Sequence, residues 1–172
     1  MVEAALELRA LWTPIGEIAV IGGTAGVCRV CLPGEEPEVA LVNLAPECSE
    51  GSLDPGKVAR KGAEEVYRYF AGELREFSVP VDLGPVAGFR RRVLEEAASI
   101  PFGETASYQE MAIAAGSPGA VRAAGSAMGA NPVPILIPCH RVIRADGSPG
   151  MYGGGEELKL RLLEFEAAAV TS

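Results

Sequence analysis

The sequence has a single histidine, His140, and it lacks any apolar run close to the ~18 residues that a membrane-spanning helix requires. Residues 1–8 contain no basic segment, so we expect no signal peptide. These absences predict a protein that works inside the cell, in the cytoplasm, or in the nucleus if the source is a eukaryote. A single histidine also leaves one place for a side chain that titrates near neutral pH.

Cysteine is scarce, and the pattern of the four cysteines does not support a metal centre. Cys28 and Cys31 have CxxC spacing, but the second pair that a metal site would need is missing. The residues around them alternate as in a strand, whereas a redox CxxC motif opens a helix. We therefore expect structural cysteines and no metal, and whether Cys28, Cys31 and Cys48 form disulfides is left open. Cys139 is expected to remain a thiol, which suits a reducing compartment.

Positive charge is also in short supply, with a net charge of −8, and this balance argues against a nucleic-acid partner. The distribution changes that view. Residues 1–87 carry 14 acidic and 7 basic side chains, whereas residues 88–144 carry 4 and 6. The one basic segment contains Cys139. A basic patch on an acidic protein is compatible with DNA binding, although the long-range attraction is modest.

The central feature of the chain is the segment Asn131–Ile143, in which three prolines occur within seven positions. Proline fixes φ and favours extended geometry in the residue before it, so residues 131–138 are predicted to cross the core as an extended, buried segment. Cys139 and His140 follow. A thiol beside an imidazole is the arrangement of an activated nucleophile. The alternative is a buried cysteine that acts as a small hydrophobe. Neighbours on a strand point to opposite faces, so the thiol and the imidazole would then interact only through a bridging water.

The amino-terminal half is predicted to be a small α/β domain over residues 1–80, followed by a linker over 81–88. Strands are expected over residues 6–11, 17–22, 27–32 and 39–44. Residues 56–71 have helical periodicity, and the charged residues of this helix, Glu65 among them, are expected to face solvent.

The carboxyl-terminal domain, residues 89–172, is predicted to be mostly helical. Helices are expected over residues 89–99, 109–115, 118–128 and 156–169. Ser117 is the expected N-cap of the third, with Pro118 as its first residue, and two helices joined by a short turn suggest a helix-turn-helix. The third helix has small residues and one charge, Arg122, whereas recognition helices carry several base-reading side chains. It is either a tightly packed core helix or one that inserts an arginine from the minor groove with little sequence specificity.

The run Pro138-Cys139-His140-Arg141, preceded by Asn131-Pro132-Val133-Pro134-Ile135-Leu136-Ile137, resembles the active-site motif of the O6-alkylguanine-DNA alkyltransferases. The resemblance is specific over residues 89–166 and looser from Trp12 onward. It implies an α/β (α+β) protein, with a small ribonuclease-H-like amino-terminal α/β domain and a mostly helical carboxyl-terminal domain that carries a DNA-binding helix-turn-helix.

The resemblance also implies roles for individual residues. Cys139 would accept the alkyl group, His140 would take the thiol proton through a bridging water, and Glu166 would orient and charge-balance the imidazole. Asn131 would tie the helix-turn-helix to the active-site segment. Tyr108 would promote nucleotide flipping and donate to guanine N3. We expect the pKa of the thiol to lie modestly below the ~8.5 of free cysteine.

Two further groups of residues follow from the resemblance. Contacts with DNA are implied for Ser107, Tyr108, Ala120, Val121, Arg122 and Ala123. A guanine pocket is implied for Pro134, Val142, Met151, Tyr152 and Gly153. Gly153 replaces a hydroxyl residue of several family members, so a hydrogen bond near O6 is lost or is made by backbone N–H. Met151 is apolar and is expected to alter the tolerance for bulky alkyl groups.

The predicted function is the irreversible, stoichiometric transfer of an alkyl group from guanine O6, and less readily from thymine O4, to Cys139. The expected partner is double-stranded DNA that carries O6-alkylguanine, approached from the minor groove by a monomer, with no cofactor, metal or membrane. One alternative is a non-enzymatic helix-turn-helix module that binds DNA or lesions and has a structural cysteine. A cysteine hydrolase built on Cys139 and His140 is another, but the sequence offers it no oxyanion hole.

Overall fold

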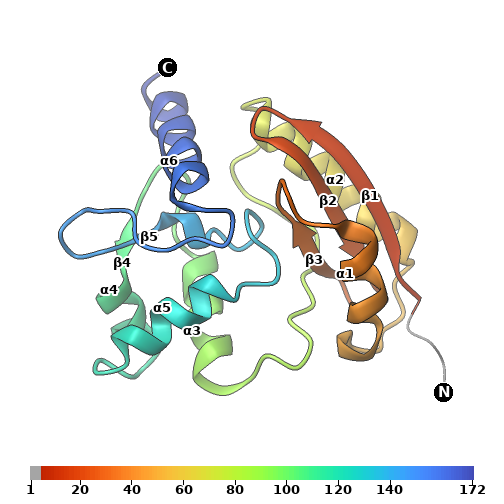
Figure 1. Cartoon of the computed structure of the whole chain (residues 1–172), viewed down its shortest axis with the longest axis horizontal. Helices are drawn as coiled ribbons and strands as arrows, with labels where there is room; N and C mark the ends of the chain where they lie inside the picture. Colours follow the sequence, from red (N-terminus) through yellow and green to blue (C-terminus); the bar gives the residue numbers. More distant parts are fainter. Residues whose placement is uncertain (1–4) are drawn as a thin grey trace. The chain divides into compact units, whose positions relative to one another are not determined.

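The computed structural model describes residues 5–172 and divides into two compact units, Met1–Pro85 and Val86–Ser172 (Figure 1). This division falls within residues 81–88, the predicted linker. Both units mix helices and strands, which confirms the predicted α/β class. Residues 1–4, the beginning of the segment in which no signal peptide was expected, lie outside the described residues. Within residues 5–172, no helix is both long and apolar enough to cross a bilayer.

The amino-terminal unit contains an antiparallel sheet of three strands in the order β1-β2-β3. β1 (Glu7–Thr13) and β2 (Gly16–Gly22) form a hairpin in which Thr13 pairs with Gly16, and β3 (Val27–Cys31) pairs with the other edge of β2. These elements confirm the three strands predicted over residues 6–32. β2 is buried along most of its length, and it forms the centre of the unit.

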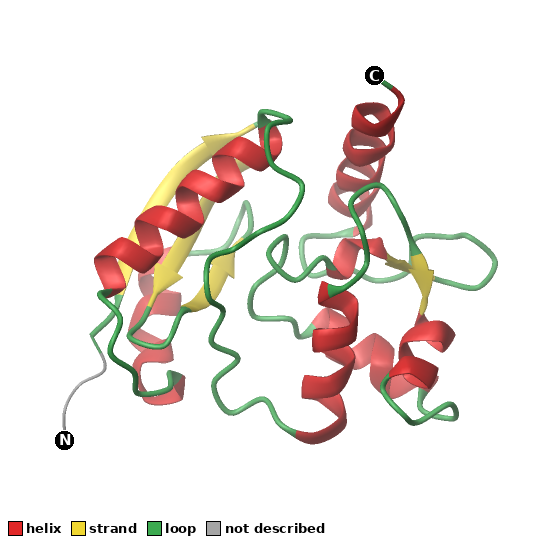
Figure 2. Ribbon diagram, turned by 180° about the vertical axis from the view of Figure 1, so that it is seen from behind, coloured by secondary structure: helices red, strands yellow, loops and turns green. Residues whose placement is uncertain are grey.

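Two helices cover opposite faces of this sheet, α1 (Pro37–Leu44) and α2 (Pro55–Phe70) (Figures 1 and 2). The prediction of a strand over residues 39–44 was wrong, because that segment is α1. Ala40, Leu41 and Leu44, spaced as on one face of a helix, pack against the cluster formed by Ala19, Ile21 and Cys31. Val42, which an alternating strand pattern would have paired with Ala40, is 77% exposed.

α2 packs closely on β2 because Gly62 has no side chain. A Cβ atom at this position would lie 2.8 Å from a methyl carbon of Val20. On the same helix, Glu65 was predicted to face solvent, and this was wrong: it is 6% exposed. Its carboxylate accepts hydrogen bonds from the backbone N–H of Ser78 (2.9 Å) and Val79 (3.1 Å) and from the Ser78 hydroxyl (2.6 Å). These bonds compensate for its burial and fix the chain that leaves α2.

The carboxyl-terminal unit is mostly helical (Figure 2). Its helices are α3 (Gly88–Ala98), α4 (Tyr108–Ala114), α5 (Val121–Gly129) and α6 (Glu156–Thr171). The predicted apolar stripe of α3, Val93, Leu94 and Ala97, is buried. Two short parallel strands, β4 (Ala106–Ser107) and β5 (Val142–Ile143), join the start of α4 to the segment that follows Cys139.

The connection from α4 to α5 differs from the prediction. Ser117 does not cap the helix that was predicted over residues 118–128. That helix is α5, which begins at Val121, and its N-cap, Ala120, makes no capping bond from its side chain. The carbonyl of Ser117 instead accepts the N–H of Ala120 in a turn (2.9 Å). The capping box of this region is at α4, where the Ser107 hydroxyl accepts the N–H of Glu110 and the Glu110 carboxylate accepts the N–H of Ser107.

Residues 131–138 are buried as predicted, but they do not form an extended crossing. The N–H of Ile137 donates to the carbonyl of Val133 (3.0 Å), and Pro134 forms an isolated bridge with Ile137. The chain reverses at Ile135, which has a φ of 74°, a conformation that β-branched residues rarely adopt. The prolines restrict their own φ angles and disfavour helix, but they leave Ile135 free to make the turn.

Candidate active site

Cys139 and His140 lie in a short 3₁₀ turn, η2 (Cys139–Arg141), and not on a strand. The turn contacts α3 and α6. Cys139 is 3% exposed and His140 is fully buried. The objection that neighbours on a strand point to opposite faces therefore does not apply to this pair.

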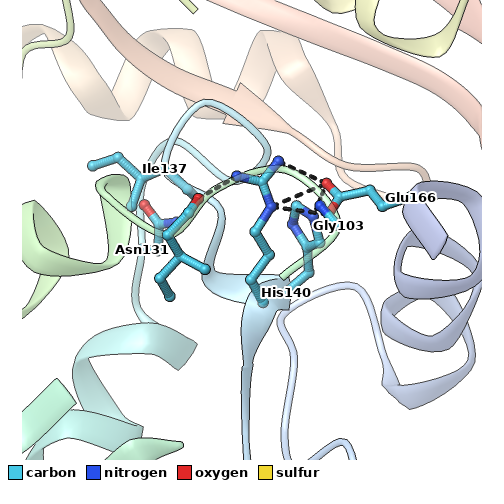
Figure 3. A network of polar contacts seen from close by, with 7 residues as sticks. Gly103, Asn131, Ile137, His140 and Glu166 are labelled. Carbon is cyan, nitrogen blue, oxygen red and sulfur yellow. Dashed lines mark hydrogen bonds and ion pairs between the residues drawn. The ribbon is translucent and has the colours of Figure 1, made fainter. Parts of the chain in front are cut away.

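Glu166 of α6 joins the imidazole and the guanidinium of η2 in one buried network (Figure 3). Its Oε1 atom lies 2.8 Å from His140 Nε2 and accepts a bond from Arg141 Nη2 (2.7 Å). Its Oε2 atom accepts the N–H of Gly103 (3.1 Å) and Arg141 Nε (2.9 Å). Arg141 also donates to the carbonyl of Ile100 (2.7 Å). Glu166 and Arg141 are thus each held from at least two directions, whereas within residues 5–172 the imidazole of His140 is held through Nε2 alone.

These contacts determine the protonation of the network. Burial by itself raises the pKa of Glu166, but hydrogen bonds from His140 and Arg141 outweigh it and lower the pKa to about 2. Burial lowers the pKa of His140 against the opposing effect of Glu166, so the imidazole is neutral at pH 7. An ionised carboxylate accepts hydrogen bonds, so Nε2 carries the proton of the neutral ring. His140 Nδ1 is buried without a hydrogen-bond partner among residues 5–172, and it is the ring's proton acceptor.

The thiol itself is protonated at rest. Burial raises the pKa of Cys139 to about 11, although hydrogen bonding from Asn131 and the charge of Lys159 oppose the increase. The expectation of a pKa modestly below that of free cysteine was wrong, because it considered the neighbouring imidazole but not the complete burial of the sulfur. A thiol with this pKa needs a base to react near neutral pH.

Asn131 holds the segment that leads to the thiol. Its side-chain N–H donates to the carbonyl of Ile137 (2.8 Å), and its Oδ1 accepts the N–H of Val133 (3.0 Å). Asn131 comes just after the C-cap of α5, and its backbone N–H donates to the carbonyl of Met128 (3.3 Å), so the buried turn at Ile135 is fixed relative to that helix.

Tyr108 lies at the start of α4, against the glycine-rich loop between β5 and α6. Its hydroxyl is 3.4 Å from the carbonyl of Met151. Gly150 makes this approach possible, since it has a φ of 75° and a Cβ there would lie 2.6 Å from the Tyr108 hydroxyl. Lys159 Nζ, on α6, donates to the same hydroxyl (3.2 Å) and to the carbonyl of Val142 (2.5 Å).

Two further residues of the site, Arg141 and Lys159, were not predicted from the sequence. Lys159 is fully buried, and burial lowers its pKa to about 8. Its amine is therefore still mostly protonated at pH 7. Its bonds connect α6, β5 and the glycine-rich loop around the thiol. The spacing of Lys159, Leu162 and Glu166 on one helical face is the signal that could have found it, since two ionisable residues interrupt a buried apolar stripe. Arg141 gave no such signal beyond its place in the motif.

The residues predicted to contact DNA fall into two groups. Val121, Arg122 and Ala123 are exposed at the start of α5, on the side away from its buried residues. Ala120 and Ser107 are half-buried, and the Ser107 side chain is occupied by its capping bond. Arg122 is therefore the charged side chain that α5 presents to solvent.

The five residues predicted to form a guanine pocket differ in exposure. Pro134 and Val142 are buried, Tyr152 is half-buried, and Gly153 and Met151 are exposed, Met151 to 78%. A cavity of about 180 Å³ lies next to β4 and β5, and none of these five residues lines it. Its lining residues are Thr105, Ala106, Ser107, Glu110, Ile143, Arg144, Ala145 and Gly147. The glycine-rich loop thus places Met151 at the surface.

Comparison with known proteins agrees with this geometry. Residues 88–168 match the family described as 6-O-methylguanine DNA methyltransferase, DNA binding domain. The chain is 40% identical over 162 residues to the methylated-DNA--protein-cysteine methyltransferase of Mycobacterium tuberculosis strain H37Rv, covering 94% of this chain and 92% of that protein. It is 39% identical over 165 residues to the rat protein of the same name, covering 90% and 78%.

A solved structure extends the likeness to the fold. The structure of Mycobacterium tuberculosis OGT in complex with DNA matches with a TM-score of 0.77 and 37% identity, over 94% of this chain and 93% of that one. Both the sequence and the fold are therefore shared along nearly the full length. With its buried Cys139-His140 turn, Glu166 network and full-length similarity, the chain belongs to the methylated-DNA–protein-cysteine methyltransferase family.

Proposed function

We propose that the protein repairs alkylated DNA by transferring the alkyl group from guanine O6, and less readily from thymine O4, to Cys139. The observation that supports this most directly is the orphan Nδ1 of the buried, neutral His140, next in sequence to a buried thiol with a pKa of about 11. In a family of cysteine methyltransferases, a base with this geometry is what such a thiol requires. No cofactor is needed for the transfer.

In the proposed reaction, the thiol proton passes through a water to His140 Nδ1, and the sulfur attacks the alkyl carbon. A carbon–sulfur bond forms as the carbon–O6 bond breaks, and its electron pair stays with the guanine. The guanine gains one proton as it is restored, and this balances the proton lost by the thiol. Glu166 keeps the imidazole in the required tautomer, and Arg141 keeps Glu166 ionised. Because a thioether is a poor leaving group, each molecule acts once.

DNA recognition is assigned to α4 and α5, acting as a helix-turn-helix that approaches the minor groove. Arg122 would insert into the stack while Tyr108 promotes rotation of the damaged nucleotide, because a buried thiol cannot reach O6 within a stacked duplex. With one charged side chain on α5, little sequence specificity is expected. We propose that the protein acts as a monomer on double-stranded DNA in the cytoplasm, or in the nucleus of a eukaryote.

The intact mass of the protein tests the transfer after it is mixed with a duplex that carries O6-methylguanine. One added methyl group on Cys139, located by peptide mapping, with restored guanine is the expected result. Cys139→Ser should remain unmodified, whereas Cys31→Ser, which alters a buried cysteine of the other unit, should react fully. An unchanged mass despite tight binding to the lesion would favour the non-enzymatic binding module. Repair of more than one equivalent of DNA would contradict the single-turnover mechanism.

Arg122 is tested separately, with two substrates. Arg122→Ala should slow repair of the duplex while leaving the reaction with the free base O6-benzylguanine unchanged, because only the duplex requires a nucleotide to be flipped. Equal slowing on both substrates would show that Arg122 acts on the active site and not on the DNA.

A further inference from the structure

Arg144 is an exposed cation that neither the proposed reaction nor the predicted DNA contacts use. The other cations near the thiol, Arg141 and Lys159, are buried and bonded within the active site. Within residues 5–172, the guanidinium of Arg144 forms no ion pair or hydrogen bond. A permanently charged side chain is thus available to a ligand in the unit that carries the reaction.

Arg144 lies beside the start of α4. It follows β5 directly, and the parallel pairing of β5 with β4 sets Ile143 opposite Ser107, the N-cap of α4 (Figure 1). The next residues of the two segments are Arg144 and Tyr108. Burial raises the pKa of Tyr108, and the positive charge of Arg144 opposes the increase, so the two side chains interact. Arg144 is therefore a neighbour of the residue that is proposed to promote nucleotide flipping.

A closed turn fixes the backbone of Arg144. Its N–H donates to the carbonyl of Ser148 (2.9 Å), and its carbonyl accepts the N–H of Gly147 (3.0 Å). Asp146, within the turn, uses Oδ1 to accept both the N–H (2.9 Å) and the hydroxyl (2.6 Å) of Ser148. The carboxylate nearest to Arg144 in the sequence is therefore bonded to Ser148, and the guanidinium stays free.

Arg144 also lines the cavity of about 180 Å³ next to β4 and β5. Thr105 and Ser107 add hydroxyl groups to its lining, and Glu110 adds a carboxylate. That carboxylate is engaged in the capping box, where it accepts the N–H of Ser107 (2.6 Å). The Ser107 hydroxyl accepts the N–H of Glu110 and keeps its own proton to donate. An arginine beside hydroxyl donors is a combination that binds phosphate oxygens.

We propose that Arg144 binds a phosphate of the DNA backbone at this cavity, beside the nucleotide on which Tyr108 acts. Arginine suits this role because its guanidinium is always charged and matches phosphate oxygens with two parallel bonds. A phosphate contact positions the duplex without reading its sequence, which agrees with the low specificity expected of α5. The inference deepens the proposed function and rests on it, because the ligand is a phosphate only if α4 and α5 approach a duplex.

Binding of the full-length protein to an unmodified duplex tests the contact without requiring alkyl transfer. Fluorescence anisotropy of the labelled duplex gives the affinity at a series of salt concentrations. Each phosphate that a protein neutralises on B-DNA contributes about −0.9 to the slope of log affinity against log salt. Arg144→Gln should make this slope less steep by about 1, and by the same amount for duplexes of different sequence. Binding at low salt should weaken roughly tenfold.

Three further variants separate the contact from general effects of charge. Arg144→Lys keeps the charge and should restore the slope, but only part of the affinity, because an ammonium lacks the paired donors. Asp146→Asn keeps an acceptor for Ser148 and removes a negative charge next to the phosphate, so it should tighten binding. Arg60→Gln makes the same change of charge on α2, outside residues 88–168 that match the DNA-binding domain, and should bind as the wild type does.

An unchanged slope in Arg144→Gln would overturn the proposal, and so would equal losses in Arg144→Gln and Arg60→Gln or a wild type that does not bind the duplex at low salt. Circular dichroism of each variant checks that it is folded. Failure of the proposed alkyl transfer would look different. In that case binding to the duplex would depend on Arg144, but the mass of the protein would not change after mixing with O6-methylguanine DNA.

Discussion

Glu166 makes two kinds of contact, and they have different consequences. Its bonds with Arg141 keep the carboxylate ionised, with a pKa of about 2, so the proton taken up by His140 does not move on to it. Its bond with His140 Nε2 selects the tautomer that leaves Nδ1 as the base. Glu166 therefore orients the imidazole of His140. Its negative charge, however, mainly balances the positive charge of Arg141 and not that of a protonated His140.

Glu166→Gln separates orientation from packing. The amide has the same shape, but one of its two terminal atoms is a donor, so it cannot accept from His140, Arg141 and Gly103 together as the two carboxylate oxygens do, and the correct tautomer loses support. The single-turnover rate of methyl transfer should fall on the order of 10²–10⁴-fold, the usual contribution of a positioned base. Glu164→Gln, an exposed neighbour on α6, is the control and should leave the rate unchanged. A rate within threefold of wild type for Glu166→Gln would show that the tautomer is fixed by other contacts.

The pH dependence follows from the direction of the His140 shift. Burial lowers the pKa of His140 below its ordinary 6.5, and only the neutral ring can accept a proton. The methyl-transfer rate should therefore hold as pH falls to 6.5 and decrease only below it. The same sign applies to stability: a group that folds with a lowered pKa contributes above its unfolded pKa and loses that contribution as pH falls. A half-maximal rate at or above pH 6.5, in single-turnover assays from pH 5 to 9, is the result that this account forbids.

At the level of elements, the two serines near α4 and α5 test the capping assignment. Ser107→Ala removes the bond to the N–H of Glu110 and should lower the free energy of unfolding by about 1 kcal/mol, a typical value for an N-cap. Ser117→Ala should be nearly neutral, because that side chain caps no helix. Urea unfolding followed by circular dichroism measures both. Equal losses would mean that the turn before α5 depends on the Ser117 hydroxyl.

The elements that were predictable from sequence are those in which the spacing of apolar residues coincides with the face that is buried in the structure. α3 is one, since the spacing of Val93, Leu94 and Ala97 is its buried face. The short apolar run of α1 fits strand and helix equally, and only packing against the sheet decides. The turn at Ile135 was not predictable, because its positive φ is imposed by the burial and hydrogen bonds around it. For the site, the nucleophile and base came from adjacent residues.

The remaining parts of the site depend on contacts distant in sequence. Glu166 was placed only through the family resemblance, because it lies 26 residues from His140 and meets it through the packing of α6. Lys159 and Arg141 are buried cations that reach carbonyls on other segments, Val142 and Ile100. Periodicity assigns such residues to a helix face or a loop, but it does not indicate which distant carbonyl or carboxylate will satisfy them.

For the whole molecule, the chemistry should affect stability after it is complete. Cys139 is 3% exposed, and His140, the next residue, is fully buried, so the new methyl group enters a packed region. Adding a methylene to a well-packed core typically costs about 1–3 kcal/mol. For domains of roughly 60–100 residues, the size class of the unit Val86–Ser172, each kcal/mol lowers the midpoint of thermal unfolding by about 4–8 °C. The methylated protein should therefore unfold several degrees below the unreacted protein.

Differential scanning calorimetry of the two forms measures this shift, with Cys139→Ala treated with the same DNA as the control for bound oligonucleotide. Because the chain consists of two compact units, two transitions are expected if the units unfold separately, and only that of Val86–Ser172 should move. Methylation that leaves both transitions in place would mean that the site has room for the alkyl group, and that the surroundings of the thiol are packed more loosely than its burial indicates.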